Sequence, residues 1–136
     1  MQGSAPGICF PGQDDRTTSR IAVLAIDAAE PRVLADFWCA VLGWSVVETD
    51  GTSISIGDGA GRQIDVLPVP EARTVKNRLH LDLRADGSST AAELERLLAL
   101  GARRVDVGQA ADASWTVLAD PEGNEFCLLS RTVQEV

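Results

Sequence analysis

The only histidine of the 136-residue sequence lies in a segment whose residue types could support acid–base chemistry. Residues 78–84 read Arg-Leu-His-Leu-Asp-Leu-Arg, so polar and apolar residues alternate as they do in a β-strand. His80 and Asp82 then share one face of the strand and the leucines share the other. A carboxylate that fixes the tautomer of an imidazole raises its basicity, which favours a general base. The same alternation also fits an ordinary strand whose polar face is solvated.

The charge and hydropathy of the chain argue against two classes of binding partner, nucleic acids and membranes. The formal net charge is -8, which argues against binding to the phosphates of nucleic acids. No apolar run approaches the roughly 18 residues of a membrane span. Residues 1–19 lack the basic start and apolar middle of a signal peptide. We therefore expect no nucleic-acid partner, no membrane partner and a cytoplasmic location.

The three cysteines do not form the Cys-x-x-Cys pattern of a structural zinc site. Their odd number and mostly apolar surroundings favour reduced thiols that pack as small hydrophobic side chains. Hydrophobic residues make up 45% of the chain, which is ordinary for a globular protein. At this length we expect one folded domain.

The first half of the sequence predicts one strand, one helix and then three strands. The continuous apolar run at residues 21–27 favours a strand that is buried on both faces. Pro31 suits the first turn of a helix, and Gly43 suits its C-terminal cap. Three short strands separated by glycine-containing turns are expected at residues 44–49, 53–56 and 62–67.

The second half repeats this order after a proline-containing linker at residues 68–76. Residues 78–84 form the next predicted strand, a helix follows at about residues 89–100, and Gly101 caps it. Three further strands are expected at residues 103–107, 115–119 and 125–130.

Matches between individual residues support the repeat. Val41-Leu42-Gly43-Trp44 corresponds to Ala99-Leu100-Gly101-Ala102, and Asp58-Gly59-Ala60-Gly61 corresponds to Asp120-Pro121-Glu122-Gly123. This self-similarity predicts an α+β fold of two βαβββ modules that form a concave mixed sheet, with the helices on the outside. The predicted folded domain covers residues 20–131, with modules at about 20–68 and 77–131, a flexible tail at 1–19 and a short tail at 132–136.

Three parts of the sequence carry a family resemblance. They read Leu-Ala-Asp-Phe-Trp at 34–38 with Leu-Gly-Trp at 42–44, Lys-Asn-Arg-Leu-His-Leu-Asp-Leu at 76–83, and Trp-Thr-Val-Leu-Ala-Asp-Pro-Glu-Gly-Asn-Glu-Phe-Cys at 115–127. In these segments the chain resembles the vicinal oxygen chelate superfamily, which includes glyoxalase I, extradiol dioxygenases and bleomycin resistance proteins. It looks most like the glyoxalase-like subgroup, and the resemblance implies a cup that faces away from the helices.

The resemblance also implies where a metal would be bound. Metal-dependent members place four ligands, usually His, Gln or Glu, on the first, fourth, fifth and eighth strands. Val23 takes the first position here and has no donor atom, and Cys127 takes the eighth, where the metalloenzymes have Glu. The fourth position is either Asp65 or Leu67, and the fifth is His80. We therefore expect no metal and no other cofactor, because most of the usual ligands are missing.

The expected cup has a few residues that could act on a ligand. His80 is the candidate general base, with Asp65 or Asp82 as the carboxylate that orients it. Trp44 and Trp115 begin their strands, so each could stack on a flat ligand or could simply pack in the core. The predicted ligand-binding residues are Val23, Leu67, Asp82, Trp44, Trp115, Glu125 and Cys127.

Two functions fit such a cup. The first is metal-free binding of a small organic molecule by a homodimer, as the resemblance to bleomycin resistance proteins implies. The alternative is a metal-independent lyase, isomerase or cyclase that uses His80 as a general base. A metal-dependent glyoxalase or dioxygenase is less favoured because its ligand set is incomplete.

Overall fold

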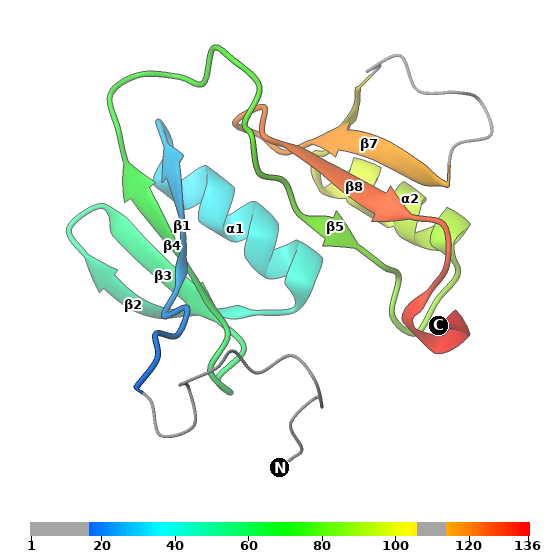
Figure 1. Ribbon diagram of the computed structural model, residues 1–136. Coiled ribbons are helices and arrows are strands. Elements are labelled where there is room, and N and C mark those ends of the chain that lie inside the picture. The colour runs from blue at the N-terminus through cyan, green and yellow to red at the C-terminus, as the bar shows by residue number, and fades with distance from the viewer. Residues whose placement is uncertain (1–16, 106–113) are drawn as a thin grey trace.

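Two βαβββ modules follow one another in the computed structural model, which describes residues 17–105 and 114–136 (Figure 1). This arrangement confirms the predicted α+β fold of two repeated modules. The first module consists of β1 (Leu24–Ala28), α1 (Pro31–Leu42), β2 (Ser45–Asp50), β3 (Ser53–Gly57) and β4 (Gln63–Pro68). The second consists of β5 (Asp82–Leu83), α2 (Thr90–Leu100), β6 (Arg103–Arg104), β7 (Trp115–Ala119), β8 (Glu125–Leu129) and the 3₁₀ helix η1 (Val133–Glu135).

Each module contains a four-stranded mixed sheet, and the two sheets have the same topology. The strand order is β1-β4-β3-β2 in the first sheet and β5-β8-β7-β6 in the second. In both sheets the first pair of strands is parallel and the other two pairs are antiparallel. The edge strands β1 and β5 therefore hold equivalent places in their sheets.

The hairpins of the two modules also match in register. Each hairpin turn closes with the same backbone hydrogen bond, from Asp58 to Arg62 in the first module and from Asp120 to Asn124 in the second. Counted from these turns, Asp65 of β4 occupies the position that Cys127 occupies in β8. They lie opposite Ser55 and Val117, which are equivalent residues of β3 and β7.

Both helices end as their sequences predict. Pro31 occupies the first turn of α1, where its missing N–H costs no helical hydrogen bond. The hydroxyl of Ser89 accepts a 3.0 Å hydrogen bond from the backbone N–H of Ala92 and so caps α2. Gly43 and Gly101 follow the two helices with φ values of 71° and 117°, a left-handed region that glycine enters without a Cβ clash.

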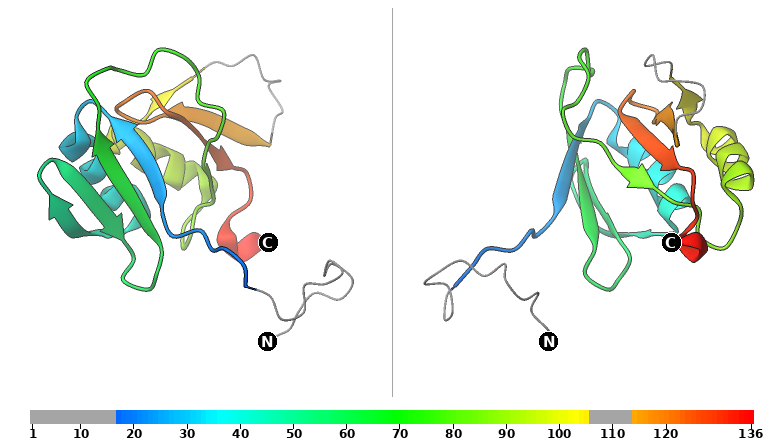
Figure 2. Two further views of the ribbon diagram at one scale, coloured as in Figure 1. Left: turned by 60° about the vertical axis from the view of Figure 1, so that its left-hand side comes forward. Right: turned by 45° about the vertical axis from the view of Figure 1, so that its right-hand side comes forward.

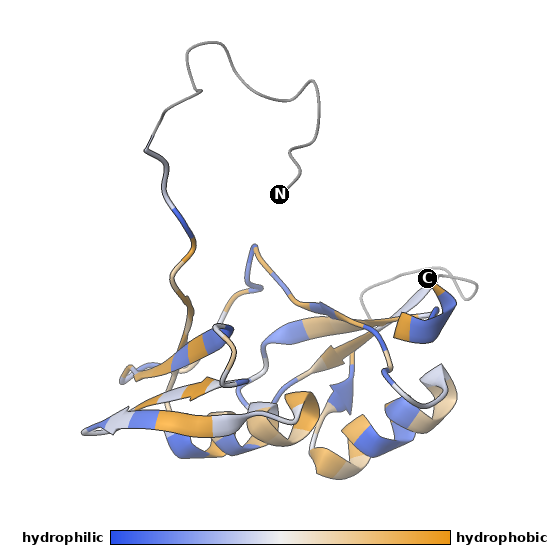
Figure 3. Cartoon of the chain, turned by 90° about the horizontal axis from the view of Figure 1, so that it is seen from below, coloured by the Kyte–Doolittle hydropathy of each residue, from blue (hydrophilic) through white to orange (hydrophobic). Residues whose placement is uncertain are grey.

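The hydrophobic core joins the two modules. α1 lies against the strands of the first sheet and also contacts α2 (Figure 2). Phe37 and Trp38 of α1 make edge-on contacts with Phe126 of β8, with ring centroids 6.2 and 5.0 Å apart. The same core cluster includes Leu34 of α1 and Leu97 of α2. Hydrophobic and hydrophilic segments alternate along the strands and helices around this core (Figure 3).

The first strand differs from its prediction. β1 begins at Leu24, and Leu24, Ala25 and Asp27 are all exposed, so the expectation of a strand buried on both faces is wrong. β1 is the edge strand of its sheet, and α1 covers only one of its faces. A continuous apolar run therefore does not establish burial on both sides.

The segment around His80 is less regular than predicted. Only β5 pairs with β8, although the whole of residues 78–84 alternates in sequence. Continuing the parallel register would place residues 78–79 opposite the hairpin turn before β8, where no extended partner exists. Leu81 and Leu83 pack against the core as expected, whereas Leu79 is 81% exposed.

β6 and η1 lie near the ends of the two described segments. The strand predicted at residues 103–107 is present as β6, and residues 106–113 lie outside the described part. At the C-terminus, the Val133 N–H donates to the Ala85 carbonyl, which attaches η1 to the chain after β5. Neither helix among the described residues is long and apolar enough to cross a membrane.

Candidate functional site

His80, Asp82 and Cys127 form a cluster on one face of the second sheet. Asp82 of β5 pairs with Cys127 of β8, and His80 precedes Asp82 by two residues on the same side of the chain. His80 Nδ1 lies 3.0 Å from Asp82 Oδ1. One ligand atom from each of the three residues lies within 4.8 Å of the others.

The contact with Asp82 fixes which nitrogen of His80 is free. A carboxylate only accepts hydrogen bonds, so Nδ1 carries the proton that is donated to Asp82. Nε2 of the neutral ring is then an acceptor that can take a proton from a bound molecule. Both side chains are about half exposed, so a ligand can reach this nitrogen.

Cys127 is a poor nucleophile in this setting. Burial is the main reason that the pKa of its thiol is raised, and the negative charge and hydrogen bond of Asp82 raise it further. The thiol therefore keeps its proton at neutral pH, whereas nucleophilic cysteines react as thiolates.

The raised pKa of the Cys127 thiol also bears on whether His80, Asp82 and Cys127 can bind a metal ion. Imidazole, carboxylate and thiolate are all ligands that Zn²⁺ accepts, but hard ions such as Mn²⁺ prefer oxygen donors. A thiol must lose its proton before it binds a metal, and both burial and Asp82 oppose that loss at Cys127. His80 and Asp82 alone supply only two donors, so the residues fit a resident metal ion poorly.

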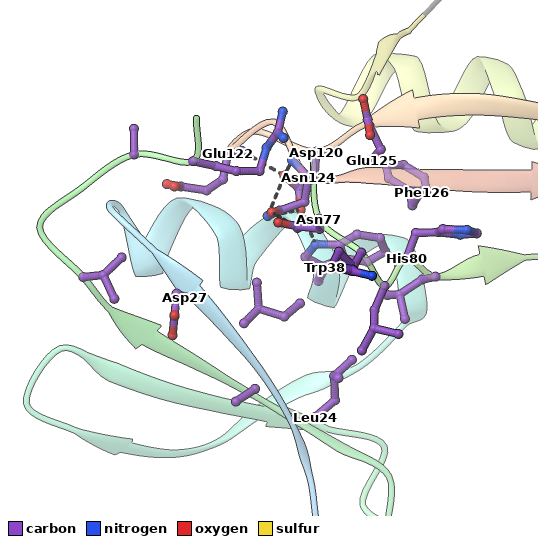
Figure 4. A pocket seen from close by; sticks show the side chains of 18 of the residues that line it. Leu24, Asp27, Trp38, Asn77, His80, Asp120, Glu122, Asn124, Glu125 and Phe126 are labelled. Carbon is purple, nitrogen blue, oxygen red and sulfur yellow. Dashed lines mark hydrogen bonds between the residues drawn. The ribbon is translucent and has the colours of Figure 1, made fainter. Parts of the chain in front are cut away.

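A cavity of about 730 Å³ lies between the two modules, next to His80 (Figure 4). The exposed edge strand β1 lines one side, and the residues around His80 line the other. The linker between β4 and β5 and the turn between β7 and β8 complete the lining. Much of the wall is apolar and is formed by Leu24, Ile26, Trp38, Val69, Leu81 and Phe126.

The turn before β8 is attached to α1 by buried hydrogen bonds. Asp120 is fully buried, and its carboxylate accepts a 3.0 Å hydrogen bond from Trp38 Nε1. It also accepts hydrogen bonds from the backbone N–H groups of Glu122 and Asn124, both at 2.9 Å. Trp38 and Asp120 both line the cavity, so these bonds fix one of its walls.

Two further contacts connect this turn to other parts of the cavity wall. The Glu122 carboxylate accepts hydrogen bonds from the backbone N–H groups of Ala29 and Glu30, immediately before α1. A negative group there is favoured by the helix dipole and by the free N–H groups. Asn77 of the linker donates a 2.7 Å hydrogen bond to the Asn124 side chain.

The structure separates the predicted site residues into different surroundings. Asp65 lies in the other sheet from His80, and its carboxylate accepts hydrogen bonds from Ser55 and Gln63. Asp82 is therefore the carboxylate that contacts His80. Of the predicted residues, His80 and Glu125 line the cavity. Val23, Leu67, Trp44, Trp115, Asp82 and Cys127 are not part of its lining.

The two tryptophans at strand starts have different environments. Trp44 is half-buried and packs against the hydrophobic core, which is the packing alternative that its sequence position allowed. Trp115 is 41% exposed at the start of β7, opposite Leu129 of β8. Trp38, which its apolar helix face marked as a core residue, is the tryptophan that lines the cavity.

Several cavity residues were not selected from the sequence. Arg73 and Asn77 belong to segments without periodicity, and Glu122 and Asn124 belong to a turn. Arg78 begins the alternating segment at residues 78–84 and shares the predicted face of His80, so the alternation was an available signal for it. For the turn, the Asp-Pro-Glu-Gly-Asn run was the available signal, because its match to Asp58-Gly59-Ala60-Gly61 marked a turn that carries extra polar groups.

Comparison with known proteins agrees with this architecture. The sequence model of a family described as "Glyoxalase-like domain" matches residues 23–129. A search of curated proteins found no match.

Solved structures give the same fold. The fosfomycin resistance protein FosX from Listeria monocytogenes, as a mutant complexed with Mn(II) and 1S,2S-dihydroxypropylphosphonic acid, is 13% identical, with a TM-score of 0.66 over 88% of this chain and 95% of FosX. A glyoxalase/bleomycin resistance protein/dioxygenase family enzyme from Burkholderia phytofirmans PsJN is 18% identical, with a TM-score of 0.61 over 80% and 96% of the two chains. The oxidase ChaP-H2 is 18% identical, with a TM-score of 0.60 over 85% and 95%. At these identities the similarity shows the fold alone.

Proposed function

Because the chain belongs to the glyoxalase-like domain family, we propose that it binds a small organic molecule, without a metal, in the cavity between its two modules. A volume of about 730 Å³ falls within the usual range of small-molecule sites. Such sites combine apolar walls with a few placed polar groups, and this cavity has both. The observation that carries the proposal is the His80–Asp82 pair, 3.0 Å apart, at the side of an apolar cavity.

A second candidate function follows from the same pair. Asp82 holds the Nδ1 proton of His80, so Nε2 is available as a general base. A metal-independent lyase, isomerase or cyclase needs such a base to remove a proton from a small carbonyl compound or a similar metabolite. The geometry of His80 is compatible with binding alone and with this chemistry.

The metal-free part of the proposal rests on the donors around Cys127. Its thiol is held in the protonated form by burial and by Asp82, which leaves only two ready donors for an ion. Elemental analysis of the purified protein is expected to show no stoichiometric divalent metal. About one zinc, iron, nickel or manganese per chain, lost on His80→Ala, would contradict this and favour a glyoxalase or dioxygenase.

A ligand screen by thermal unfolding tests the binding function. A ligand present at about 100 times its dissociation constant stabilises the folded state by about 2.7 kcal/mol, which is easily measured. Once a ligand is found, wild type and His80→Gln are compared for binding and for product formation. A binding protein leaves the ligand unchanged, and His80→Gln then weakens affinity only by about one hydrogen bond, 0.5 to 1.5 kcal/mol.

The catalytic alternative gives a different result in the same experiment. A general base contributes roughly 10² to 10⁴ in rate, so His80→Gln would lower turnover by that factor with little change in affinity. Asp82→Asn is the matched second variant, because it removes the charge beside Nδ1 and keeps the shape. Product formation that depends on His80 would contradict simple binding.

We also propose that the protein is a homodimer. β1 and β5 are edge strands, and the side chains of Leu79, which precedes β5, and of Val75 in the linker are 81% and 73% exposed. Unpaired strand edges and exposed apolar side chains are typical of a surface that meets another chain. Light scattering is expected to give the mass of a dimer, and Leu79→Asp is expected to shift it toward the monomer, unlike Val33→Asp on the outer side of α1. A wild-type monomer would contradict the proposal.

A further inference from the structure

The two buried side-chain atoms without a hydrogen-bond partner both belong to residues that line the cavity. Among the described residues these atoms are Arg73 Nε and Glu125 Oε1. Buried polar atoms are satisfied in the great majority of cases, so each exception needs a physical explanation. A bound molecule in the cavity between the modules would supply the missing partners (Figure 4).

Arg73 is held in place without being neutralised. Its guanidinium lies over Gly123 in the turn before β8, where an added Cβ would be 3.3 Å from Nη2. Its Nη1 donates a hydrogen bond to the carbonyl of Val75. Glycine at this turn thus leaves the space that the guanidinium occupies, and the arginine keeps unused N–H donors.

Arg78 adds a second positive charge to the same lining. Within residues 17–105 and 114–136, no carboxylate lies within ion-pair distance of Arg73 or Arg78. Ion pairs are scarce among the described arginines, so the stronger observation is that Arg73 also has a buried N–H without a hydrogen-bond partner, whereas Arg78 is exposed. Arginine is the side chain best suited to bind a carboxylate or phosphonate through paired N–H groups.

The cavity lining also carries carboxylates, so it is the unmet N–H donor of Arg73, and not the overall charge of the cavity, that favours an anionic ligand. Asp120 is occupied by Trp38 and by its own turn, and Glu122 is occupied by the N–H groups before α1. Glu125 remains as an unpaired acceptor, and Asp27 and Glu71 are exposed to water. A carboxyl group can be neutralised by a proton, whereas a guanidinium keeps its charge. The N–H of Arg73 without a partner therefore needs a bound acceptor more than the Glu125 oxygen needs a bound donor.

We propose, building on the function proposed above, that the ligand is an organic anion whose carboxylate or phosphonate group is bound by Arg73 and Arg78. Its apolar part lies against the wall that includes Leu24, Trp38 and Phe126. The arginines come from the linker and its junction with the next segment, and the apolar wall comes from both modules. The linker therefore selects the charge of the ligand.

Matched small probes test this inference with the full chain. Benzoate, phenylphosphonate, benzamide and benzylammonium share one apolar body and differ in charge, and each is titrated while backbone amide shifts are recorded. A hydrogen bond to a charged group is worth about tenfold or more in affinity. At least one of the two anions is expected to bind about tenfold more tightly than benzamide, and the comparison of the two anions distinguishes carboxylate from phosphonate.

Four arginine variants locate the source of the preference. Arg73→Met is expected to abolish the roughly tenfold advantage of the anion, and Arg78→Met is expected to reduce it. Arg104→Met is the control, because Arg104 is exposed on β6 and does not line the cavity. Arg73→Lys keeps the charge and loses the paired N–H geometry, so intermediate affinity is expected and its melting curve checks folding.

The possible outcomes separate this inference from the proposed function. Equal binding of benzoate, phenylphosphonate and benzamide at the cavity would overturn the anion inference and leave small-molecule binding intact. Tightest binding of benzylammonium would identify Glu125 as the selecting group and would also overturn it. Failure of every probe to shift a cavity residue would count against both proposals.

Discussion

The two hairpin turns share one internal design and lie in opposite environments. Asp58 accepts hydrogen bonds from the backbone N–H groups of Ala60 and Arg62, at 2.7 and 3.0 Å, and the turn is exposed. Asp120 makes the equivalent two bonds in the second module, at 2.9 Å each, and is fully buried. The aspartate at the start of each turn is thus sufficient to organise the local backbone.

The difference between the turns comes from the first module's helix. Trp38 of α1 reaches Asp120, and no such partner contacts Asp58 among the described residues. Glu122, which corresponds to Ala60, adds a second link to the start of α1. One copy of the turn therefore remains a local structure, and the other joins the two modules and forms part of the cavity wall.

The largest effect is expected from removing the buried aspartate. Asp120→Ala leaves the Trp38 N–H and the turn N–H groups without an acceptor, and hydrogen bonds to charged groups contribute about 1.5 to 3 kcal/mol each. We expect a loss of about 3 kcal/mol in the free energy of unfolding, measured in denaturant. Asp58→Ala is the matched control and should cost clearly less, since water replaces its bonds. Equal losses would remove the distinction between the two turns.

Trp38→Phe should give an intermediate effect. The substitution removes the indole N–H and part of a buried ring, for an expected cost of about 2 kcal/mol. In an Asp120→Ala background the cost should be smaller, because the hydrogen bond is already lost. Trp44→Phe is the control, since Trp44 packs in the core without a hydrogen bond to Asp120. Additive losses of Trp38→Phe and Asp120→Ala would contradict the proposed link.

The smallest effect is expected from acid titration of the exposed turn. The backbone N–H groups of Ala60 and Arg62 hold the pKa of Asp58 below its ordinary value. A lowered carboxyl pKa stabilises the fold above the unfolded-state pKa, and this contribution is lost as pH falls through the folded-state pKa. An NMR titration should show the amides of Ala60 and Arg62 changing below the ordinary aspartate range, and Asp58→Asn should lack this transition. A midpoint in the ordinary range would contradict it.

Much of the fold could be predicted because it depends on local patterns. The prolines, glycines and Asp-Gly turns marked where elements begin and end, and the repeated order revealed the two modules. The exposure of β1 could not be predicted in this way, because an apolar run gives no information about which neighbours cover it. The short extent of β5 also depends on where β8 begins, far away in sequence.

The sequence predicted the pair of His80 and Asp82 in the candidate site, but not the residues that surround this pair. Strict alternation placed His80 and Asp82 on one face, and the structure brings them to 3.0 Å. The pairing of His80 with Asp65 depended on how the two sheets meet, which no periodicity encodes; the structure gives Asp65 its own partners in the first sheet. Arg73 was missed because a linker has no pattern from which to infer the direction of a side chain, whereas Arg78 begins the alternating segment at residues 78–84 and could have been placed on the face of His80.

Mapping a bound ligand onto the chain tests most directly whether the cavity between the modules is the binding site. For a ligand found by thermal screening, amide shifts are expected at residues 24–27, at residues 77–81, and at Asp120, Glu122 and residues 124–126, which together line the cavity. Their common response would show that β1, the His80 segment and the buried turn act as one site. Shifts confined instead to Ser55, Gln63 and Asp65, on the face of the first sheet, would contradict this location.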